Sequence, residues 1–320
     1  MPRIRFLAIL SAILLLFSSC AAMPLSRTAM HMDTTCSVTI YGGDAAALDA
    51  CFTTVEVYEW LWSRTDESGE LSALNAARGA PRSMTADTVA LLQLAKEYAV
   101  LTNGAFDVTT APLTDLWKAA EEADVLPDAA ALASACARVG ADKLHINGDT
   151  VALKGGAQLD LGAIAKGAVA DKAADTLRAR GCDGALLDFG GNIVAMGTKP
   201  NGQWFHIGIA DPRDSGELIA TVAVADKAVV TSGSYERGYT VGGKRYSHIL
   251  DPKSGRPVEN DLLSVTIIAD QAADADALST ACFVMGYDNA RALIDSLDGF
   301  EAVFVTADGA VEATDGVSLV

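Results

Sequence analysis

Short apolar runs of strand length crowd the second half of the chain. Between residues 185 and 269 they follow one another with only turns between them: ALLDFG, NIVAMG, WFHIGIA, LIATVAVA, KAVVTSG, YTVGGKRYSHIL and LLSVTIIA. Their β-branched and aromatic residues favour the pleated conformation. Helical spacing of apolar residues is found mainly before this stretch. Such segregation of helices from strands predicts an α+β fold and argues against a doubly wound parallel sheet.

Helices are expected where apolar residues recur every three or four positions, as Cys51, Val55 and Tyr58 do within residues 44–62. The same spacing, together with residues typical of helix ends such as Pro127 and Gly104, predicts further helices over residues 86–102, 127–139, 163–180 and 272–286. They also predict a strand over residues 36–41 and hairpins over residues 145–153 and 300–314. Asn147-Gly148 is the expected turn of the first hairpin.

The first 20 residues have the parts of an export signal. Arg3 and Arg5 supply positive charge, and residues 6–17 are apolar but too few to span a bilayer comfortably. The run ends in Phe17-Ser18-Ser19-Cys20, which resembles a bacterial lipoprotein processing site. The alternative is an ordinary cleaved signal with an incidental cysteine.

The N-terminal pattern therefore predicts a signal peptide at residues 1–19, a lipid-bearing Cys20, a tether at residues 20–30 and a folded domain at residues 31–320. A protein processed in this way is held at the cell membrane by its lipid alone, on the extracytoplasmic side.

The charge balance narrows the choice of partners. The chain has 24 Lys and Arg against 41 Asp and Glu, a formal net charge of −17 at pH 7. Nucleic acid is not an expected partner because phosphate backbones need a basic face, and anionic membrane surfaces are disfavoured for the same reason. The cysteines after Cys20 are widely spaced and include no CxxC, which is poor support for a zinc site or a disulfide framework.

The segment Asp160-Leu-Gly-Ala-Ile-Ala-Lys166-Gly167 opens the helix expected at residues 163–180. A glycine-containing turn that exposes N–H groups at a helix N-terminus, with a lysine beside it, suits a phosphate. The alternative is a packed helix start with a solvated lysine. The P-loop pattern GxxxxGK[ST] is absent.

Asp276 and Thr280 are four residues apart on an expected helix, so they share a face. A carboxylate and a hydroxyl placed together offer the hard oxygen ligands that Mg²⁺ prefers. The alternative is an acidic helix start, in which Asp274 and Asp276 simply favour the positive end of the helix dipole.

His248 stands at the end of an expected strand, just before a Pro/Gly turn. It is a candidate general base near neutral pH, and the alternative is a structural histidine bonded within the turn. The tight loops Gly190-Gly191-Asn192 and residues 231–236 could approach a ligand closely or be simple turns. Neither is GxSxG, so a hydrolase nucleophile elbow is not supported.

Seven blocks, taken together and in order, resemble the ApbE family, the FAD:protein FMN transferases. They are SRTDESGELSALN, TNGAFDVTTAPLTDLW, DLGAIAKG, LLDFGGNI, VVTSGSYER, SHILDPKSGRPV and ADALSTA. The resemblance implies a single two-lobed, T-fold-related α+β domain with mostly antiparallel sheets and flanking helices. It also implies a cleft for FAD between the lobes.

The activity implied is Mg²⁺-dependent transfer of the FMN half of FAD to a Thr or Ser hydroxyl of a target flavoprotein, with release of AMP. The target is an exported flavoprotein, and ion-pumping redox complexes are typical clients of the family. By resemblance, Asp276, Thr280 and the Ala163 carbonyl hold Mg²⁺. The FAD contacts implied are Met32, Ala105, Phe106, Asp107, Asp160, Lys166 and Leu250. His248 is the candidate acceptor of the hydroxyl proton.

Three positions depart from the family pattern. Ser279 stands where some relatives carry another metal-contacting acid, and Thr65 stands where some carry a flavin-stacking tyrosine. Met32-Asp33-Thr34 replaces the usual Met-Gly-Thr. The alternatives to a transferase are an FAD pyrophosphatase, a flavin-binding lipoprotein without catalysis, and a solute-binding lipoprotein, whose repeated α/β pattern is not visible.

Overall fold

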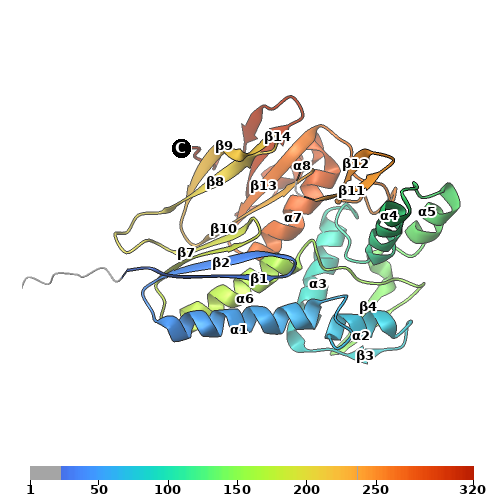
Figure 1. The fold of residues 1–320 in the computed structure, drawn as a ribbon, viewed down its shortest axis with the longest axis horizontal. Coiled ribbons are helices and arrows are strands. Elements are labelled where there is room, and N and C mark those ends of the chain that lie inside the picture. Colours follow the sequence, from blue (N-terminus) through green and yellow to red (C-terminus); the bar gives the residue numbers. More distant parts are fainter. Residues whose placement is uncertain (1–22, 236) are drawn as a thin grey trace, which may run out of the picture.

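The computed structural model describes residues 23–235 and 237–320, which form two lobes (Figure 1). The larger lobe is built on an eight-stranded antiparallel sheet whose two edges are the first and the last strand of the described chain. Its strands, in spatial order, are β1 (Leu25–His31), β2 (Thr34–Tyr41), β6 (Gly184–Phe189), β7 (Asn192–Gly197), β10 (Lys227–Gly233), β13 (Leu262–Ala269), β14 (Glu301–Thr306) and β15 (Val311–Ala313).

Both faces of this sheet are covered, which explains why β13 reads as a continuous apolar run rather than an alternating one. The main core lies between one face and three helices, α1 (Ala45–Trp62), α6 (Ala165–Ala179) and α7 (Ala272–Met285). Helix α8 (Tyr287–Asp295) contacts α7 and β14. A second core lies on the other face, under the hairpin of β8 (Phe205–Asp211) and β9 (Asp214–Val224).

The smaller lobe is mainly helical. Its helices are α2 (Glu70–Ala76), α3 (Ala86–Leu101), α4 (Ala111–Ala123), α5 (Ala129–Cys136) and the 3₁₀ turn η1 (Ala141–Lys143). Its strands are β3 (Arg82–Ser83), β4 (Leu144–Asn147) and β5 (Thr150–Leu153) in one sheet, and β11 (Gly238–Val241) and β12 (Lys244–Ser247) in a hairpin. This hairpin packs on α4, where the ring of Trp117 meets the rings of Tyr239 and Tyr246.

The α+β class, the antiparallel sheets and the five expected helices are confirmed. Helices α2, α4 and α8 were not predicted. Two of the three are short, and α4 begins at Ala111-Pro112 inside a stretch that carries several turn-forming residues. In the first hairpin Asn147 pairs with Thr150, so the turn consists of Gly148 and Asp149, one residue later than expected.

The tether expected over residues 20–30 is wrong for its second half. From Leu25 onwards the chain is already strand β1, paired along its whole length with β2. Hydroxyl pairs such as Thr28–Ser37 (2.9 Å) line the exposed face, so this edge strand lacks the apolar run by which strands are recognised. The predicted signal and Cys20 lie outside the described residues. Within the part that is described, no helix has the length and apolarity needed to cross a bilayer.

Candidate functional site

Helices α6 and α7 approach each other closely at Gly167. A Cβ atom at this position would lie only 2.1 Å from the carbonyl oxygen of Ala272, so only glycine fits. The approach lets the Gly167 N–H donate to Oδ2 of Asp276 over 3.0 Å. The Asp276 side chain is buried (residue 2% exposed), and its Oδ1 lies 3.7 Å from the ammonium of Lys166. One predicted metal ligand and one predicted FAD contact are therefore neighbours.

Thr280 lies one turn further along α7 and faces β10. Its Oγ1 is 3.2 Å from Oγ of Ser232, which is also 2.9 Å from Oγ of Ser279. Ser279 in turn donates to the Asp276 carbonyl oxygen over 3.0 Å. The side chains of Asp276 and Thr280 are thus both held by residues of neighbouring elements, Gly167 on α6 and Ser232 on β10. Ser279 is fully buried and links α7 to β10.

The N-terminus of α6, expected to meet a phosphate, is partly taken up by the protein itself. The helix starts at Ala165 without a side-chain cap, and the Gly167 N–H binds the Asp276 carboxylate. Lys166 folds back so that its ammonium donates to the Gly162 carbonyl over 3.0 Å. Ala163 lies half-buried in the turn just before the helix. The positive end of the helix dipole therefore stabilises a buried carboxylate.

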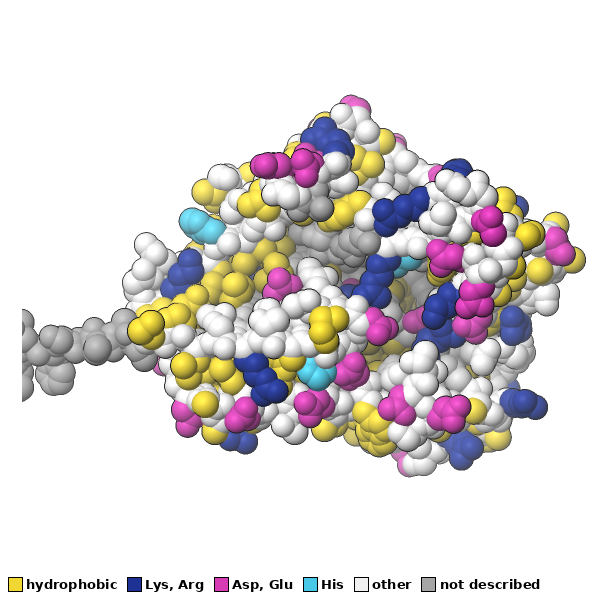
Figure 2. Space-filling view, in the orientation of Figure 1, with side chains coloured by type: hydrophobic (Ala, Val, Ile, Leu, Met, Phe, Trp, Pro, Cys, Tyr) yellow, Lys and Arg dark blue, Asp and Glu magenta, His cyan; other side chains and the backbone are white. Residues whose placement is uncertain are grey.

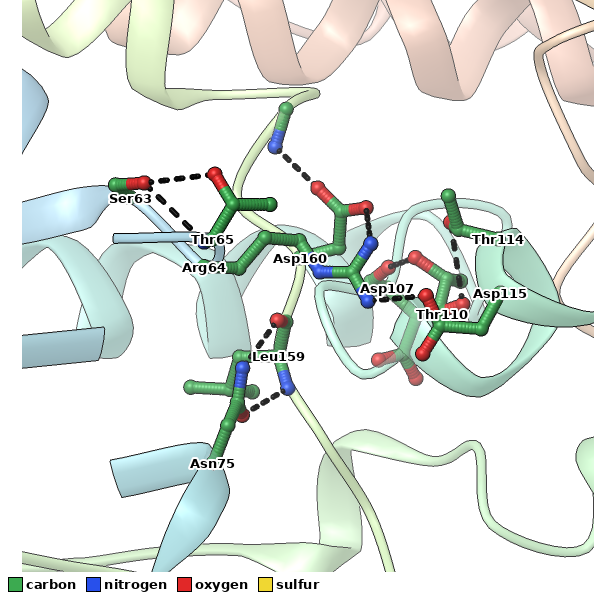
Figure 3. Close-up of polar contacts among 11 residues, drawn as sticks. Ser63, Arg64, Thr65, Asn75, Asp107, Thr110, Thr114, Asp115, Leu159 and Asp160 are labelled. Carbon is green, nitrogen blue, oxygen red and sulfur yellow. Dashed lines mark hydrogen bonds and ion pairs between the residues drawn. The ribbon is translucent and has the colours of Figure 1, made fainter. Parts of the chain in front are cut away.

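The segment before α6 is pinned from two sides (Figure 3). The amide of Asn75 donates to the Leu159 carbonyl (2.9 Å) and accepts from the Leu159 N–H (2.7 Å), as a neighbouring strand would. The next residue, Asp160, donates its N–H to the Val108 carbonyl over 2.8 Å. These bonds place Asp160 without the help of a regular sheet.

The Asp160 carboxylate takes part in a small ionic network. Its Oδ1 accepts from the Gly162 N–H (3.0 Å), and its Oδ2 lies 3.6 Å from the guanidinium of Arg64. Figure 3 shows that guanidinium between Asp160 and Asp115, to which it donates over 2.6 Å. The negative charge of Asp160 also contributes, after burial, to raising the pKa of the nearby Tyr239 to about 12.

The triplet Ala105-Phe106-Asp107 follows α3. Ala105 and Phe106 are buried, whereas the Asp107 carboxylate is half-buried and accepts from the N–H (2.7 Å) and hydroxyl (2.6 Å) of Thr109. Asp107 borders a cavity of about 660 Å³ between the ends of α3 and α5 and the turn after β12. The lining includes Gly104 and Lys253 but none of Lys166, His248, Asp276 or Thr280. This volume is in the range of small-molecule sites.

Met32 forms the β1–β2 turn together with Asp33, and both residues have positive φ angles (51° and 55°). Glu59 on α1 holds the turn from one side, since its carboxylate accepts from the Met32 N–H (2.6 Å) and lies 2.7 Å from Nδ1 of His31. Arg237 holds it from the other side by donating to the Asp33 carbonyl over 2.6 Å.

His248 is bound to the same arginine. Its Nδ1 and its backbone N–H are 3.0 and 3.3 Å from the Arg237 carbonyl. Since a carbonyl only accepts, Nδ1 carries the proton and Nε2 keeps a free lone pair. Burial lowers the pKa of His248 to about 4, although its contact with the carbonyl opposes the shift, and the charge of Lys166 lowers it further. The imidazole is therefore neutral at physiological pH.

Leu250 lies apart from these polar groups. It is buried in a cluster with Leu113, Trp117 and Tyr239, and it forms an isolated bridge with Pro257. The hydrophobic wall that it joins belongs to the smaller lobe. Among the described residues, its contacts are with this wall and not with Asp276 or Met32.

The space-filling view shows a hollow between the lobes, with basic and acidic side chains and a histidine at its rim (Figure 2). Of the predicted residues, Asp276, Thr280, Lys166 and Asp160 form one connected neighbourhood through the contacts described above, and His248 is close enough for the charge of Lys166 to lower its pKa. Among the residues with described positions, no group of three or more His, Cys, Asp and Glu could hold a metal. A metal here would need hydroxyl and carbonyl oxygens besides the Asp276 carboxylate.

Several residues in this neighbourhood were not predicted: Glu59, Arg64, Asn75, Ser232 and Arg237. Arg64, Asn75, Ser232 and Arg237 lie inside the sequence blocks that carried the resemblance, so their positions were marked but their roles were not. Glu59 lies on α1 among apolar residues, and no sequence signal connects it with the distant turn at Met32. Only the folded chain shows what these side chains hold in place.

The chain is similar to known proteins in both sequence and structure. The ApbE family profile matches residues 32–304. An FAD:protein FMN transferase of Treponema pallidum is 38% identical over 316 residues, which cover 91% of this chain and 87% of that protein. The crystal structure of the ApbE protein of Thermotoga maritima superposes with a TM-score of 0.84 at 30% identity, covering 91% of this chain and 97% of the other. The flavinyl transferase ApbE of Pseudomonas stutzeri gives 0.81 at 30% identity, covering 91% and 95%.

Proposed function

The chain belongs to the ApbE family, and from that premise we propose that it is an FAD:protein FMN transferase. It moves the FMN half of FAD onto a Thr or Ser hydroxyl of an exported flavoprotein and releases AMP. The support comes from the relatives, which carry this activity in their names, and from the arrangement of acidic, basic and hydroxyl groups beside the hollow between the lobes.

FAD is the substrate in this proposal. The dinucleotide enters the hollow between the lobes, where Met32, Lys166 and Asp160 approach from the larger lobe and its entry segment. Asp107, with Ala105 and Phe106, and Leu250 approach from the smaller lobe. The cavity of about 660 Å³ beside Asp107 offers room for one end of an extended ligand. Arg64 and Asn75 keep Asp160 in position, so they are positioning residues.

The donor set suits Mg²⁺. Asp276 supplies a buried carboxylate whose Oδ1 lies 3.7 Å from the Lys166 ammonium, Thr280 supplies a hydroxyl, and Ala163 supplies a carbonyl. Hard oxygens with one carboxylate leave room for water and phosphate oxygens, which is the usual way that Mg²⁺ is held. When bound there, the ion would neutralise charge on the pyrophosphate and act as a Lewis acid.

The chain's own residues complete the reaction. His248 Nε2 removes the proton from the target hydroxyl, whose oxygen forms a bond to the phosphorus of the FMN half. The bond between that phosphorus and the bridging oxygen breaks, and the oxygen leaves with AMP. Lys166 adds positive charge near the leaving phosphate. The neutral tautomer of His248, fixed by the Arg237 carbonyl, is the form that this step requires.

The observation that carries the proposal is the buried Asp276 carboxylate beside Lys166, with Thr280 one turn away. The experiment is to incubate the protein with FAD, Mg²⁺ and an exported flavoprotein domain from the same organism, and to look by mass spectrometry for an acceptor carrying one FMN. We expect Asp276→Asn to reduce the transfer rate by at least about 100-fold, a loss of roughly 3 kcal/mol of transition-state stabilisation.

Asp270→Asn is the matched control, because Asp270 is an exposed carboxylate just before the same helix and pairs with Lys227. Its transfer rate should equal that of the parent. If Asp276→Asn kept full transfer, the metal role of this carboxylate would be wrong. Release of FMN and AMP without an acceptor, as fast as transfer with one, would instead make the protein an FAD pyrophosphatase.

The membrane anchor is a separate part of the proposal. Cys20 carries lipid after removal of residues 1–19, and the enzyme works on the extracytoplasmic side of the membrane. The support is the sequence pattern alone: positive charge, an apolar run and Ser-Ser-Cys. Mass spectrometry of the N-terminal peptide tests it, because an unmodified Cys20 or an intact residue 1 would contradict it.

A further inference from the structure

One end of the larger lobe exposes apolar side chains that the proposed activity does not use. Met23 is 85% exposed, Leu25 39% and Trp204 57%. We call this set the N-terminal apolar end. Figure 1 shows the described chain beginning at the end of the lobe to which the β7–β8 loop also extends.

The contacts place Leu25 and Trp204 at the same end of the lobe but on opposite faces of the large sheet. Leu25 pairs with Ile40 in the β1–β2 ladder, and the ring of the next residue, Tyr41, packs at 5.7 Å from the ring of Phe205. Trp204 directly precedes Phe205 in the chain. Phe205 points into the second core and is almost fully buried, so Trp204 points the other way.

The loop that presents Trp204 is well ordered by its own hydrogen bonds. The Lys199 N–H donates to the Gln203 carbonyl over 2.9 Å, and Oδ1 of Asn201 accepts from the Gln203 N–H over 3.0 Å. Because Trp204 points outwards from this turn, its ring adds little buried apolar area to the core of the lobe. It is the residue type that settles at membrane–water interfaces, where its ring is apolar and its N–H remains hydrated.

The length of chain before the described residues limits how far Cys20 can lie from this end. Cys20 is five residues before Leu25, so a fully extended chain places its Cα at most about 18 Å from that of Leu25. We propose that the N-terminal apolar end rests in the headgroup layer of the bilayer that holds the Cys20 lipid, with Trp204 inserted at the interface. This proposal depends on the lipid anchor proposed above.

Charge does not drive this contact. The same end carries Arg180 on the turn after α6 and Lys199 beside Phe205, but also Asp44 and Asp183. The chain as a whole is strongly acidic. Insertion of apolar side chains therefore holds the protein in place next to its lipid, and the contact should be insensitive to salt and should not require anionic lipid.

This orientation fixes where the reaction takes place. Strand β1 runs away from the N-terminal apolar end for seven residues, which is about 20 Å. At its far end the Met32-Asp33 turn is tied through Arg237 to His248. The reacting groups are thus held about 20 Å above the headgroups, and the partner must present its hydroxyl at that height.

The experiment uses the lipidated full chain in phosphatidylcholine vesicles, with or without bromine on the acyl chains, which quenches tryptophan fluorescence on contact. We expect bromine to quench part of the emission of the parent and of Trp60→Phe. In Trp204→Phe this quenching should be lost. Trp60 is a suitable control because it is also exposed (44%) but lies near the other end of α1.

Equal quenching in the parent and in Trp204→Phe would overturn the proposal, as would the absence of quenching in a parent whose Cys20 is shown by mass spectrometry to carry lipid. An unlipidated Cys20 overturns the anchor and this orientation together. Transfer of FMN to a soluble acceptor should be unchanged in Trp204→Phe, so failure of the orientation is distinguishable from failure of the proposed activity.

Discussion

At His248 a single backbone carbonyl decides which ring nitrogen is available for chemistry. The Arg237 carbonyl accepts from Nδ1, so the lone pair remains on Nε2. The same arginine donates to the Asp33 carbonyl beside the predicted FAD contact Met32. One residue therefore orients the proposed proton acceptor and steadies the turn that contains Met32. In this arrangement Arg237 positions other groups and takes no part in the reaction itself.

The low pKa of His248 makes a prediction about stability. Burial lowers this pKa from 6.5 to about 4 in the folded chain. The unfolded chain then binds the proton first, so the stability that this group contributes is present above pH 6.5 and is lost as the pH falls to about 4. Urea unfolding at several pH values should show a falling free energy over this window. The slope should be smaller in His248→Gln.

His206→Gln is the control, because His206 is exposed on β8. It should keep the slope of the parent. Transfer activity should also show no ionisation of His248 in the neutral range, because the proposed base is already neutral there. A transfer rate that falls with a pKa near 6.5, and loses that dependence in His248→Gln, would contradict the assigned environment.

At the scale of elements, the site depends on how closely α6 and α7 cross. Gly167 is the contact point, and it brings an N–H of one helix to the Asp276 carboxylate of the other. Asp171, one turn further along α6, accepts from the N–H groups of Ala272 and Ala273 over 2.8 and 2.9 Å and so caps the start of α7. Burial raises the pKa of Asp171 to about 6. Helices α6 and α7 are thus joined by two carboxylates, that of Asp276 on α7 and that of Asp171 on α6.

Gly167→Ala should separate these helices. The added methyl group would overlap the Ala272 carbonyl, and overpacking of this kind costs about 1–3 kcal/mol of unfolding free energy. FMN transfer should fall more than stability explains, because the Asp276 carboxylate moves away from Lys166. Urea unfolding and the transfer assay measure the two effects.

Gly216→Ala is the matched control. Gly216 is exposed, lacks a positive φ angle, and a Cβ there would only make ordinary contact with the Asp214 side chain. Its unfolding free energy should change by less than about 0.5 kcal/mol. Equal effects of the two substitutions would show that the crossing of α6 and α7 is not tight.

The elements also show how far sequence reasoning reached. Apolar spacing located α1, α3, α6 and α7 because each buries one face against a sheet or helix. The pairing of β1 could not be predicted, since its hydroxyl-bearing residues give no apolar signal. Asp276 and Thr280 could be grouped from their spacing on one helix. Their meeting with Lys166 and Ser232 depends on long-range packing, which no local pattern records.

In the whole molecule, the residues predicted to contact Mg²⁺ and FAD are divided between the two lobes. Asp276, Thr280, Lys166 and Met32 belong to the larger lobe, whereas Asp107 and Leu250 belong to the smaller one. A ligand that contacts both groups would resist their separation as well as unfolding. Binding then stabilises the chain as a single unit by mass action.

We therefore expect FAD and Mg²⁺ together to raise the melting temperature more than either does alone. At 100 times the dissociation constant the stabilisation is about 2.7 kcal/mol. Calorimetry of the parent should show this increase, and Asp276→Asn should lose the part that depends on Mg²⁺. FMN or AMP alone should give a smaller effect, since each would contact fewer of the residues. An equal shift with AMP and with FAD would contradict contact with both lobes.

The order of strands in the large sheet has a consequence for the timing of assembly. Strand β2, which follows the Met32 turn, and strand β14, near the end of the chain, belong to the same sheet, and α7 lies across it. Synthesis delivers Met32 first and Thr280 only after most of the polypeptide has been made. A nascent chain therefore has no complete place for the dinucleotide, and the enzyme has to acquire it after release, wherever the finished protein resides.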